Sequence, residues 1–208
     1  MNSKEYHGWA CKSVRCATIL VVRRRMFRVE WVKAYACTAC THIPNRSHRK
    51  GVSVKISIGS DHGGFQLKEA LKAHLLEAGH AVTDVGAFDE SSVDYPVYAR
   101  KAAELVADGT CERGIVVCST GIGISIAANK VRGIRCALCT DLYSARLTRD
   151  HNNTNMLALG QFVTGEALAF AIADTWLETP FSGGERHQRR IDGISAIEQG
   201  DSGSGGSR

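Results

Sequence analysis

From Val54 onward, short apolar runs alternate with segments of helical periodicity, and this alternation restricts the fold of the 208-residue chain more than any other feature. Strands are expected over residues 54–58, 81–85, 114–118, 134–138 and 156–159. Helices are expected over residues 65–78, 95–107, 125–130, 142–149, 165–177 and 187–198. Strands and helices that take turns along a chain form a parallel sheet with helices on both faces. The sequence therefore predicts an α/β domain with five parallel strands.

Local signals support several of these boundaries. Pro96 falls in the first turn of the helix over 95–107, where its missing N–H leaves no hydrogen bond unmade. Asp141 is expected to cap the helix over 142–149. The apolar stripe of the first helix consists of Leu67, Leu71, Leu75 and Leu76. The last helix has an apolar side formed by Ile191, Ile194 and Ile197. Both helices are therefore expected to be amphipathic.

The charge of the chain is unevenly distributed. Residues 1–52 contain eleven Lys or Arg against two Asp or Glu, whereas the remainder contains fifteen against nineteen. The folded body is thus mildly acidic, which argues against a nucleic acid as its partner. No apolar run is long enough to span a membrane. We expect residues 1–53 to be a basic extension that is disordered or not part of the functional protein, residues 54–199 to be the domain, and residues 200–208 to be a flexible tail.

The eight cysteines do not form the pattern of a disulfide framework. Free thiols in apolar runs indicate a reducing compartment, and we expect the cytoplasm. In the extension, Cys37-x-x-Cys40 with His42 and His48 offers four zinc ligands, but the two pairs are closer in sequence than in a usual zinc finger. Zinc binding remains an alternative for that segment. For the domain, neither a metal nor a cofactor is expected.

The strongest chemical signal lies in the segment Val116–Ser125. An apolar strand ends at Cys118, and a Ser-Thr-Gly-x-Gly turn leads into a helix. In α/β proteins, the carboxyl end of a strand beside the start of a helix is the usual place for an active site. The helix dipole favours a thiolate there, and free amides of the turn can hold a phosphate or an oxyanion. Cys118 is a candidate base or nucleophile, although a core cysteine before an ordinary turn explains this segment equally well.

Five separated motifs occur in a fixed order and together narrow the alternatives. They are residues 59–64 (GSDHGG), 94–96 (DYP), 118–130 (CSTGIGISIAANK), 151–155 (HNNTN) and 184–190 (GERHQRR). Over residues 54–199 the chain resembles the family of type B ribose-5-phosphate isomerases and bacterial galactose-6-phosphate isomerases. The resemblance implies a Rossmann-like three-layer sandwich and a homodimer or tetramer with shared active sites. It also implies a metal-free interconversion of aldose and ketose phosphates through a cis-enediolate.

The same resemblance assigns the catalytic roles. Cys118 corresponds to the base that takes a proton from C2 and returns it to C1. His151 corresponds to the acid and base that opens the sugar ring, a task suited to an imidazole, and Asp61 is expected opposite it. The turn expected to hold the enediolate through backbone amides and one hydroxyl consists of Ser119, Thr120, Gly121, Ile122 and Gly123.

Substrate-binding roles follow from the remaining motifs. Asn152 and Tyr95 correspond to contacts with sugar hydroxyls. Arg186 and Arg190 lie four residues apart, so they share a helix face and can bind a phosphate with His62. Taken singly, each residue has a structural explanation: a loop histidine, a solvated arginine face, a tyrosine packed under a helix, or a capping aspartate. The joint pattern favours the functional interpretation.

Three residues depart from the family pattern. Ser119 stands where glycine is usual, Glu185 is an apparent insertion before Arg186, and Phe162 stands where an arginine commonly contacts the phosphate. The expected substrates are ribose 5-phosphate and ribulose 5-phosphate. Because of Phe162, an isomerase of a hexose 6-phosphate such as allose or galactose 6-phosphate is the first alternative. A non-catalytic sugar-phosphate-binding module is the second.

Overall fold

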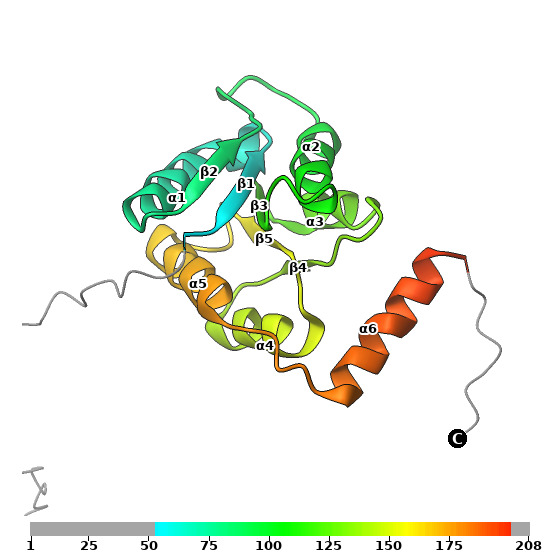
Figure 1. The fold of residues 1–208 in the computed structure, drawn as a ribbon. Coiled ribbons are helices and arrows are strands. Elements are labelled where there is room, and N and C mark those ends of the chain that lie inside the picture. Colours follow the sequence, from blue (N-terminus) through cyan, green and yellow to red (C-terminus); the bar gives the residue numbers. More distant parts are fainter. Residues whose placement is uncertain (1–52, 201–208) are drawn as a thin grey trace, which may run out of the picture. The chain divides into compact units, whose positions relative to one another are not determined.

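A computed structural model describes residues 53–200 of the chain. The expected extension and tail, including Cys37 and Cys40, lie outside these residues except at their inner edges. The strands are β1 (Lys55–Ser60), β2 (Ala81–Asp84), β3 (Arg113–Cys118), β4 (Cys136–Leu138) and β5 (Met156–Gly160). They pair in parallel in the order β2-β1-β3-β5-β4 (Figure 1). The predicted five-stranded parallel sheet is confirmed.

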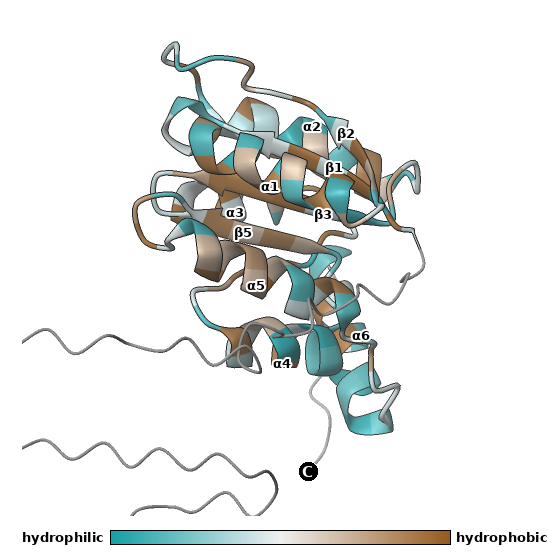
Figure 2. Cartoon of the chain, turned by 90° about the vertical axis from the view of Figure 1, so that its left-hand side faces the viewer, coloured by the Kyte–Doolittle hydropathy of each residue, from teal (hydrophilic) through white to brown (hydrophobic). Residues whose placement is uncertain are grey.

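Helices cover both faces of the sheet. They are α1 (Phe65–Glu77), α2 (Tyr95–Ala107), α3 (Ile122–Ala128), α4 (Leu142–Asn152), α5 (Glu166–Glu178) and α6 (Glu185–Glu198), with a short 3-10 turn, η1 (His62–Gly64). One core cluster joins the sheet to α1, α4 and α5, and the other joins it to α2 and α3. Figure 2 shows the apolar strands lying between the helices. The Rossmann-like three-layer arrangement is therefore confirmed.

Strand alternation determines which face each residue of β3 joins. Ile115 and Val117 belong to the core on the α1 and α5 side, whereas Val116 and Cys118 belong to the core under α2 and α3. This division follows from the two-residue period of a strand. The Cys118 side chain consequently points toward the face on which α3 begins.

The amphipathic stripe predicted for α1 is only partly correct. Leu67, Leu71 and Leu75 are buried, but Leu76 is 52% exposed. Lys68 is fully buried instead, and its Nζ lies 2.9 Å from an Asp84 carboxylate oxygen at the end of β2. A lysine can occupy this inward position because a carboxylate neutralises its charge.

Several boundaries also differ from those expected. Asp141 caps α4 as predicted, accepting a 2.8 Å hydrogen bond from the Ser144 N–H. The helix continues to Asn152, however, because Asn153 only then adopts the left-handed conformation, with φ of 44°. β4 is shorter than expected, since the Arg135 N–H donates to the Asn155 side chain and not to a neighbouring strand. α3 begins three residues earlier than predicted, at Ile122.

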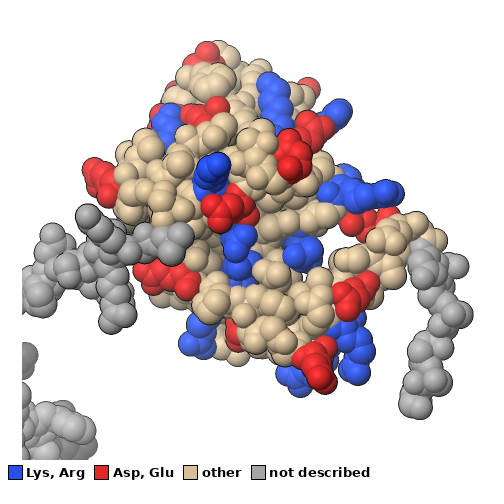
Figure 3. All heavy atoms as spheres, in the orientation of Figure 1, with Lys and Arg blue, Asp and Glu red and all other residues tan. Residues whose placement is uncertain are grey.

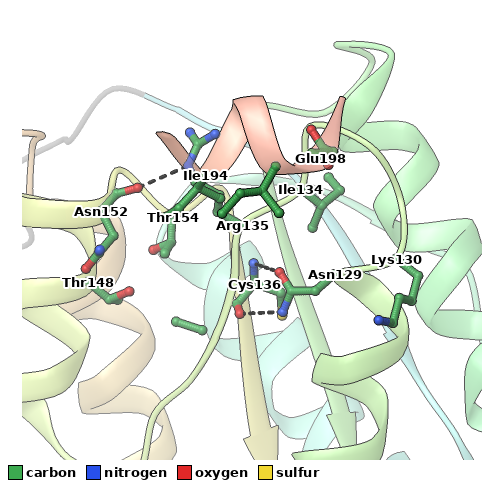
Figure 4. A pocket seen from close by; sticks show the side chains of 12 residues that line it. Asn129, Lys130, Ile134, Arg135, Cys136, Thr148, Asn152, Thr154, Ile194 and Glu198 are labelled. Atoms are coloured by element: carbon green, nitrogen blue, oxygen red, sulfur yellow. Dashed lines mark hydrogen bonds between the residues drawn. The ribbon is translucent and has the colours of Figure 1, made fainter. Parts of the chain in front are cut away.

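The last helix, α6, begins beside α4 and runs along the β4 side of the domain, where the Gly133 N–H donates to the Glu198 side chain at 2.8 Å (Figure 1). Ile191 is buried, whereas Ile194 and Ile197 are 47% and 75% exposed, so much of its apolar side is uncovered in this chain. A cleft of about 540 Å³ lies between α6 and the β4 edge, and Lys130 and Arg135 are among its lining residues (Figures 3 and 4). None of the helices within residues 53–200 is long and apolar enough to cross a membrane.

Candidate active site

Two turns meet at the carboxyl ends of β1 and β3. The chain passes from β1 to β2 on one side and then crosses to β3 on the other, which makes this point the topological switch of the sheet. A Cβ atom on Gly63 would overlap the Ser119 hydroxyl, and one on Gly64 would lie 2.5 Å from the Val117 carbonyl oxygen. The turn after β1 therefore packs directly against the turn after β3.

Cys118 is the last residue of β3 and is only 4% exposed. Its Sγ accepts a hydrogen bond from the Gly121 N–H, with a separation of 3.1 Å. Gly121 caps α3 in the left-handed conformation, with φ of 77°. An amide donor at the start of a helix stabilises negative charge on the sulfur. The expected place of a thiol beside a helix start is confirmed, and its chemical role remains a prediction.

The loop after β5 holds the cysteine turn in place. The Gln161 N–H donates to the Cys118 carbonyl at 2.9 Å, and the Phe162 N–H donates to the Ser119 carbonyl at 3.0 Å. The Phe162 side chain is 75% exposed. The aromatic residue that replaces the expected arginine is thus attached to the turn itself. Thr120 Oγ1 accepts from the Ile122 N–H at 3.3 Å, so the hydroxyl also supports the start of α3.

Asp61 is buried at the start of η1, where its Oδ1 accepts a 3.0 Å hydrogen bond from the Gly64 N–H. Burial raises the pKa of Asp61 above 3.8, and the charge of His62 and the amides of the turn oppose this effect only in part. Asp61 therefore caps the turn, which agrees with the purely structural alternative given for this residue in the sequence analysis. His62 Nδ1 accepts from the Val93 N–H at 3.2 Å, which ties the turn to the segment before α2.

Tyr95 begins α2 and lies over the turn that follows Cys118. A Cβ atom on Gly123 would lie 2.8 Å from Tyr95 Cζ, so the ring would have to shift for any larger residue at this position. The tyrosine is 39% exposed. The structure therefore brings Tyr95, the cysteine turn and the Asp61 turn to one edge of the sheet.

The other predicted residues occupy α4 and α6. His151 and Asn152 end α4, and Arg186 and Arg190 lie exposed on the first two turns of α6. The His151 Nε2 lies 3.5 Å from an Asp150 carboxylate oxygen.

These two groups of residues lie at opposite edges of the sheet, one where the parallel strands begin and the other where they end. α4 leads directly into β5, whose first residue, Met156, pairs with Gly114 near the start of β3. Cys118 pairs with Gly160 at the far end. Four residue steps at about 3.3 Å each separate the two edges by about 13 Å. Within one chain, therefore, the structure does not bring His151 together with Cys118 or with Asp61.

Sequence reasoning did not assign a role to two residues that support His151 and Asn152. Arg135 donates from Nε to the Asn152 carbonyl at 3.0 Å and from Nη2 to the Asn153 carbonyl at 2.8 Å (Figure 4). The His187 ring stacks on the His151 ring. His187 lies inside the fifth motif, so its position in the sequence was a usable signal. No comparable signal existed for Arg135.

The layers, the strand order and the amide-rich turn at the switch point define an α/β protein of the Rossmann-like class, with a cysteine at the carboxyl end of its central strand β3. The family described as Ribose/Galactose Isomerase matches residues 56–194. The chain is 51% identical to ribose-5-phosphate isomerase B of Escherichia coli strain K12 over 145 residues, which cover 70% of this chain and 97% of that protein.

Solved structures agree with this assignment. Ribose-5-phosphate isomerase B of Clostridium thermocellum matches with a TM-score of 0.70 and 53% identity, covering 71% of this chain and 99% of that one. The enzyme of Mycoplasma genitalium with bound ribulose-5-phosphate matches with a TM-score of 0.67 and 38% identity, covering 70% and 96%. The chain belongs to the ribose/galactose isomerase family and is an isomerase.

Proposed function

We propose that the chain interconverts ribose 5-phosphate and ribulose 5-phosphate in active sites that are each built from two copies of the chain. The names of the similar proteins support the substrates. The observation that carries the shared site is the division of the candidate residues between the two edges of the sheet. Cys118 of one copy meets His151 of another, because neither edge alone holds both groups.

Ring opening is the first chemical step. His151 takes the proton of the O1 hydroxyl and passes it to the ring oxygen O4, so that the C1–O4 bond breaks and the C1 aldehyde forms. An imidazole suits both halves of this transfer, because it gains and loses a proton near neutral pH. Asn152 and Tyr95 hold sugar hydroxyls while the ring opens.

Proton transfer between carbons is the second step. The Cys118 thiolate takes the C2 proton, the electrons of the C2–H bond form the C1=C2 bond, and negative charge collects on O1. The amides of residues 119–123 and the Thr120 hydroxyl stabilise this charge as it develops. Cys118 then returns the proton to C1 while the O2 proton moves to O1, which leaves the C2 ketone. The amide that Gly121 already donates to Cys118 supports this role for the thiolate.

Phosphate recognition falls to Arg186 and Arg190, which share one face of α6, with His62 contributed by the other copy. Phe162 supplies no charge at a position where an arginine is common in the family. One charge-assisted contact is worth about 1.5–3 kcal/mol, so its loss weakens phosphate binding.

A second copy also accounts for the surface of α6. Ile194 and Ile197 are exposed in one chain, and contact with another copy would cover them, which supports a homodimer or a tetramer of dimers. The four cysteines within residues 53–200 are free, which supports the cytoplasm as the location. We assign no nucleic acid or membrane partner and no metal or cofactor.

The exposed Phe162 favours one second candidate, an isomerase of a hexose 6-phosphate such as allose or galactose 6-phosphate. An uncharged aromatic ring beside the cysteine turn changes the space and the charge offered to the phosphate end of the sugar. The binding module without catalysis has no observation of its own in its favour.

The test compares turnover of ribose 5-phosphate, allose 6-phosphate and galactose 6-phosphate by the full chain and by two variants. Cys118→Ala is expected to lose turnover by a factor of about 10² or more and to keep ribose 5-phosphate binding. Cys111→Ala, which removes a buried thiol from the same core cluster, is the matched control and keeps turnover. Greater turnover of a hexose phosphate would establish the second candidate. Binding without turnover of any sugar would establish the module.

A further inference from the structure

His187 and His151 form a stacked pair between two helices. Their ring centroids are 4.2 Å apart and their planes differ by 9°. His151 belongs to the last turn of α4, and His187 belongs to the first turn of α6. The pair therefore joins the residue proposed for ring opening to the helix that carries the proposed phosphate-binding arginines.

Little else within residues 53–200 orients the His151 ring. Among the described residues, only the Asp150 carboxylate comes close, and it lies 3.5 Å from Nε2, beyond the usual length of a hydrogen bond. The torsion that turns an imidazole about its Cβ–Cγ bond has broad minima and does not fix the ring plane by itself. Within one copy, the flat contact with His187 therefore restrains that plane where a short hydrogen bond does not.

The charges around the pair favour a neutral His187. Partial burial, together with the positive charges of His151, Arg186 and Arg190, lowers the pKa of His187 below 6.5, against the opposing effect of Asp150. A neutral ring presents its electron-rich face to its neighbour. Such a face attracts a protonated imidazole and does not repel it. His187 can therefore remain stacked while His151 gains and loses a proton.

We propose that His187 is a positioning residue for ring opening: its stacked ring holds the plane of the His151 imidazole so that His151 can move a proton between O1 and O4 of the sugar. This inference rests on the proposed function. It assigns His187 no contact with the reacting atoms and no part in the transfer between C2 and C1, which belongs to Cys118.

The two proton transfers can be measured separately. Ribulose 5-phosphate cannot form a furanose, because the O5 oxygen that would close on its C2 ketone carries the phosphate. Exchange of its C1 proton with D2O therefore requires the Cys118 step and not ring opening. Turnover of ribose 5-phosphate, which is cyclic in solution, requires both.

The experiment uses the full chain with His187→Ala, His187→Phe and the control Arg189→Ala, which removes an exposed charge from the same helix. Misplacing a catalytic group costs one to two orders of magnitude, so His187→Ala is expected to lower kcat for ribose 5-phosphate by about tenfold. The KM and the C1 exchange rate of ribulose 5-phosphate are expected to change by less than about twofold. His187→Phe, which keeps a flat ring at this place, restores most of kcat, and Arg189→Ala resembles the unmodified chain.

Several results would overturn the inference. An unchanged kcat in His187→Ala would show that the stack does not position His151. Equal losses of kcat and of C1 exchange would show general damage to the site. A His187→Phe variant no better than His187→Ala would exclude the flat contact as the cause. An unmodified chain without turnover of ribose 5-phosphate would instead overturn the proposed function on which the inference rests.

Discussion

Gly121→Ala tests whether the turn after β3 is held as tightly as its contacts indicate. The new methyl group would lie 2.9 Å from the Leu159 carbonyl carbon and 3.0 Å from its oxygen, and backbone atoms of a central strand cannot move aside. Forcing atoms into a packed interior costs about 1–3 kcal/mol. The left-handed conformation at φ of 77° adds about 1–2 kcal/mol for alanine. The free energy of unfolding is therefore expected to fall by about 3 kcal/mol.

Urea unfolding at one fixed protein concentration measures this change, and Gly109→Ala is its matched control. Gly109 has a similar φ of 81°, but a Cβ atom added there would meet no other atom within 4 Å, so this variant isolates the conformational cost of about 1–2 kcal/mol. Because the Gly121 amide donates to Cys118, the first variant is also expected to lose turnover, whereas the control keeps it. Equal costs for the two variants would refute the reasoning from contacts.

Three further predictions concern the buried charges and thiols. Lys68→Ala is expected to lower the free energy of unfolding by about 3 kcal/mol, because it removes a fully buried partner of Asp84. Lys72→Ala removes a partly exposed partner of the same carboxylate and is expected to lower it by less in the same urea assay. Burial raises the pKa of Asp84, but hydrogen bonds from Lys68 and Lys72 outweigh burial and hold this pKa below 3.8. The stabilisation of the fold by the Asp84 carboxylate is therefore complete above about pH 4 and is lost as the pH falls through the pKa that Asp84 has in the folded chain. Unfolding measured between pH 5 and 3 should lose this acid dependence in Asp84→Asn, and an unchanged dependence would contradict the assignment. Burial raises the pKa of the Cys139 thiol to about 11, so mass spectrometry should find it unalkylated in the folded chain at pH 8, and rapid alkylation would contradict its burial.

The sequence predicted the fold well where local and global signals agree. The bounds of α2 were predicted at both ends, since Pro96 marks the first turn and the periodicity ends with Ala107. β4 was predicted too long, because Arg135 stands between the apolar residues Ile134 and Cys136 in the sequence, but its N–H bonds to the Asn155 side chain. That bond links segments twenty residues apart, and no local pattern encodes it.

The candidate site was predictable only in part. Cys118, Asp61 and Tyr95 all follow or face strand ends, and parallel strands bring such residues to one edge. The same rule places His151, which shortly precedes β5, at the opposite edge, and the alternation of elements was sufficient to derive this. The fifth motif marks His187 as a candidate, but its stack on His151 was not derivable, because it depends on how the start of α6 packs against the end of α4.

Complementation between two inactive variants tests the shared site most directly. Cys118→Ala and His151→Ala are each expected to be inactive, and the two chains are unfolded together in equal amounts and refolded. Half of the resulting dimers then contain one chain of each kind, and one of the two sites in each mixed dimer has both residues intact. Turnover of ribose 5-phosphate is therefore expected to return to about one quarter of that of the unmodified chain. A mixture that stays inactive, although mass spectrometry shows mixed dimers, would contradict a site built from two copies.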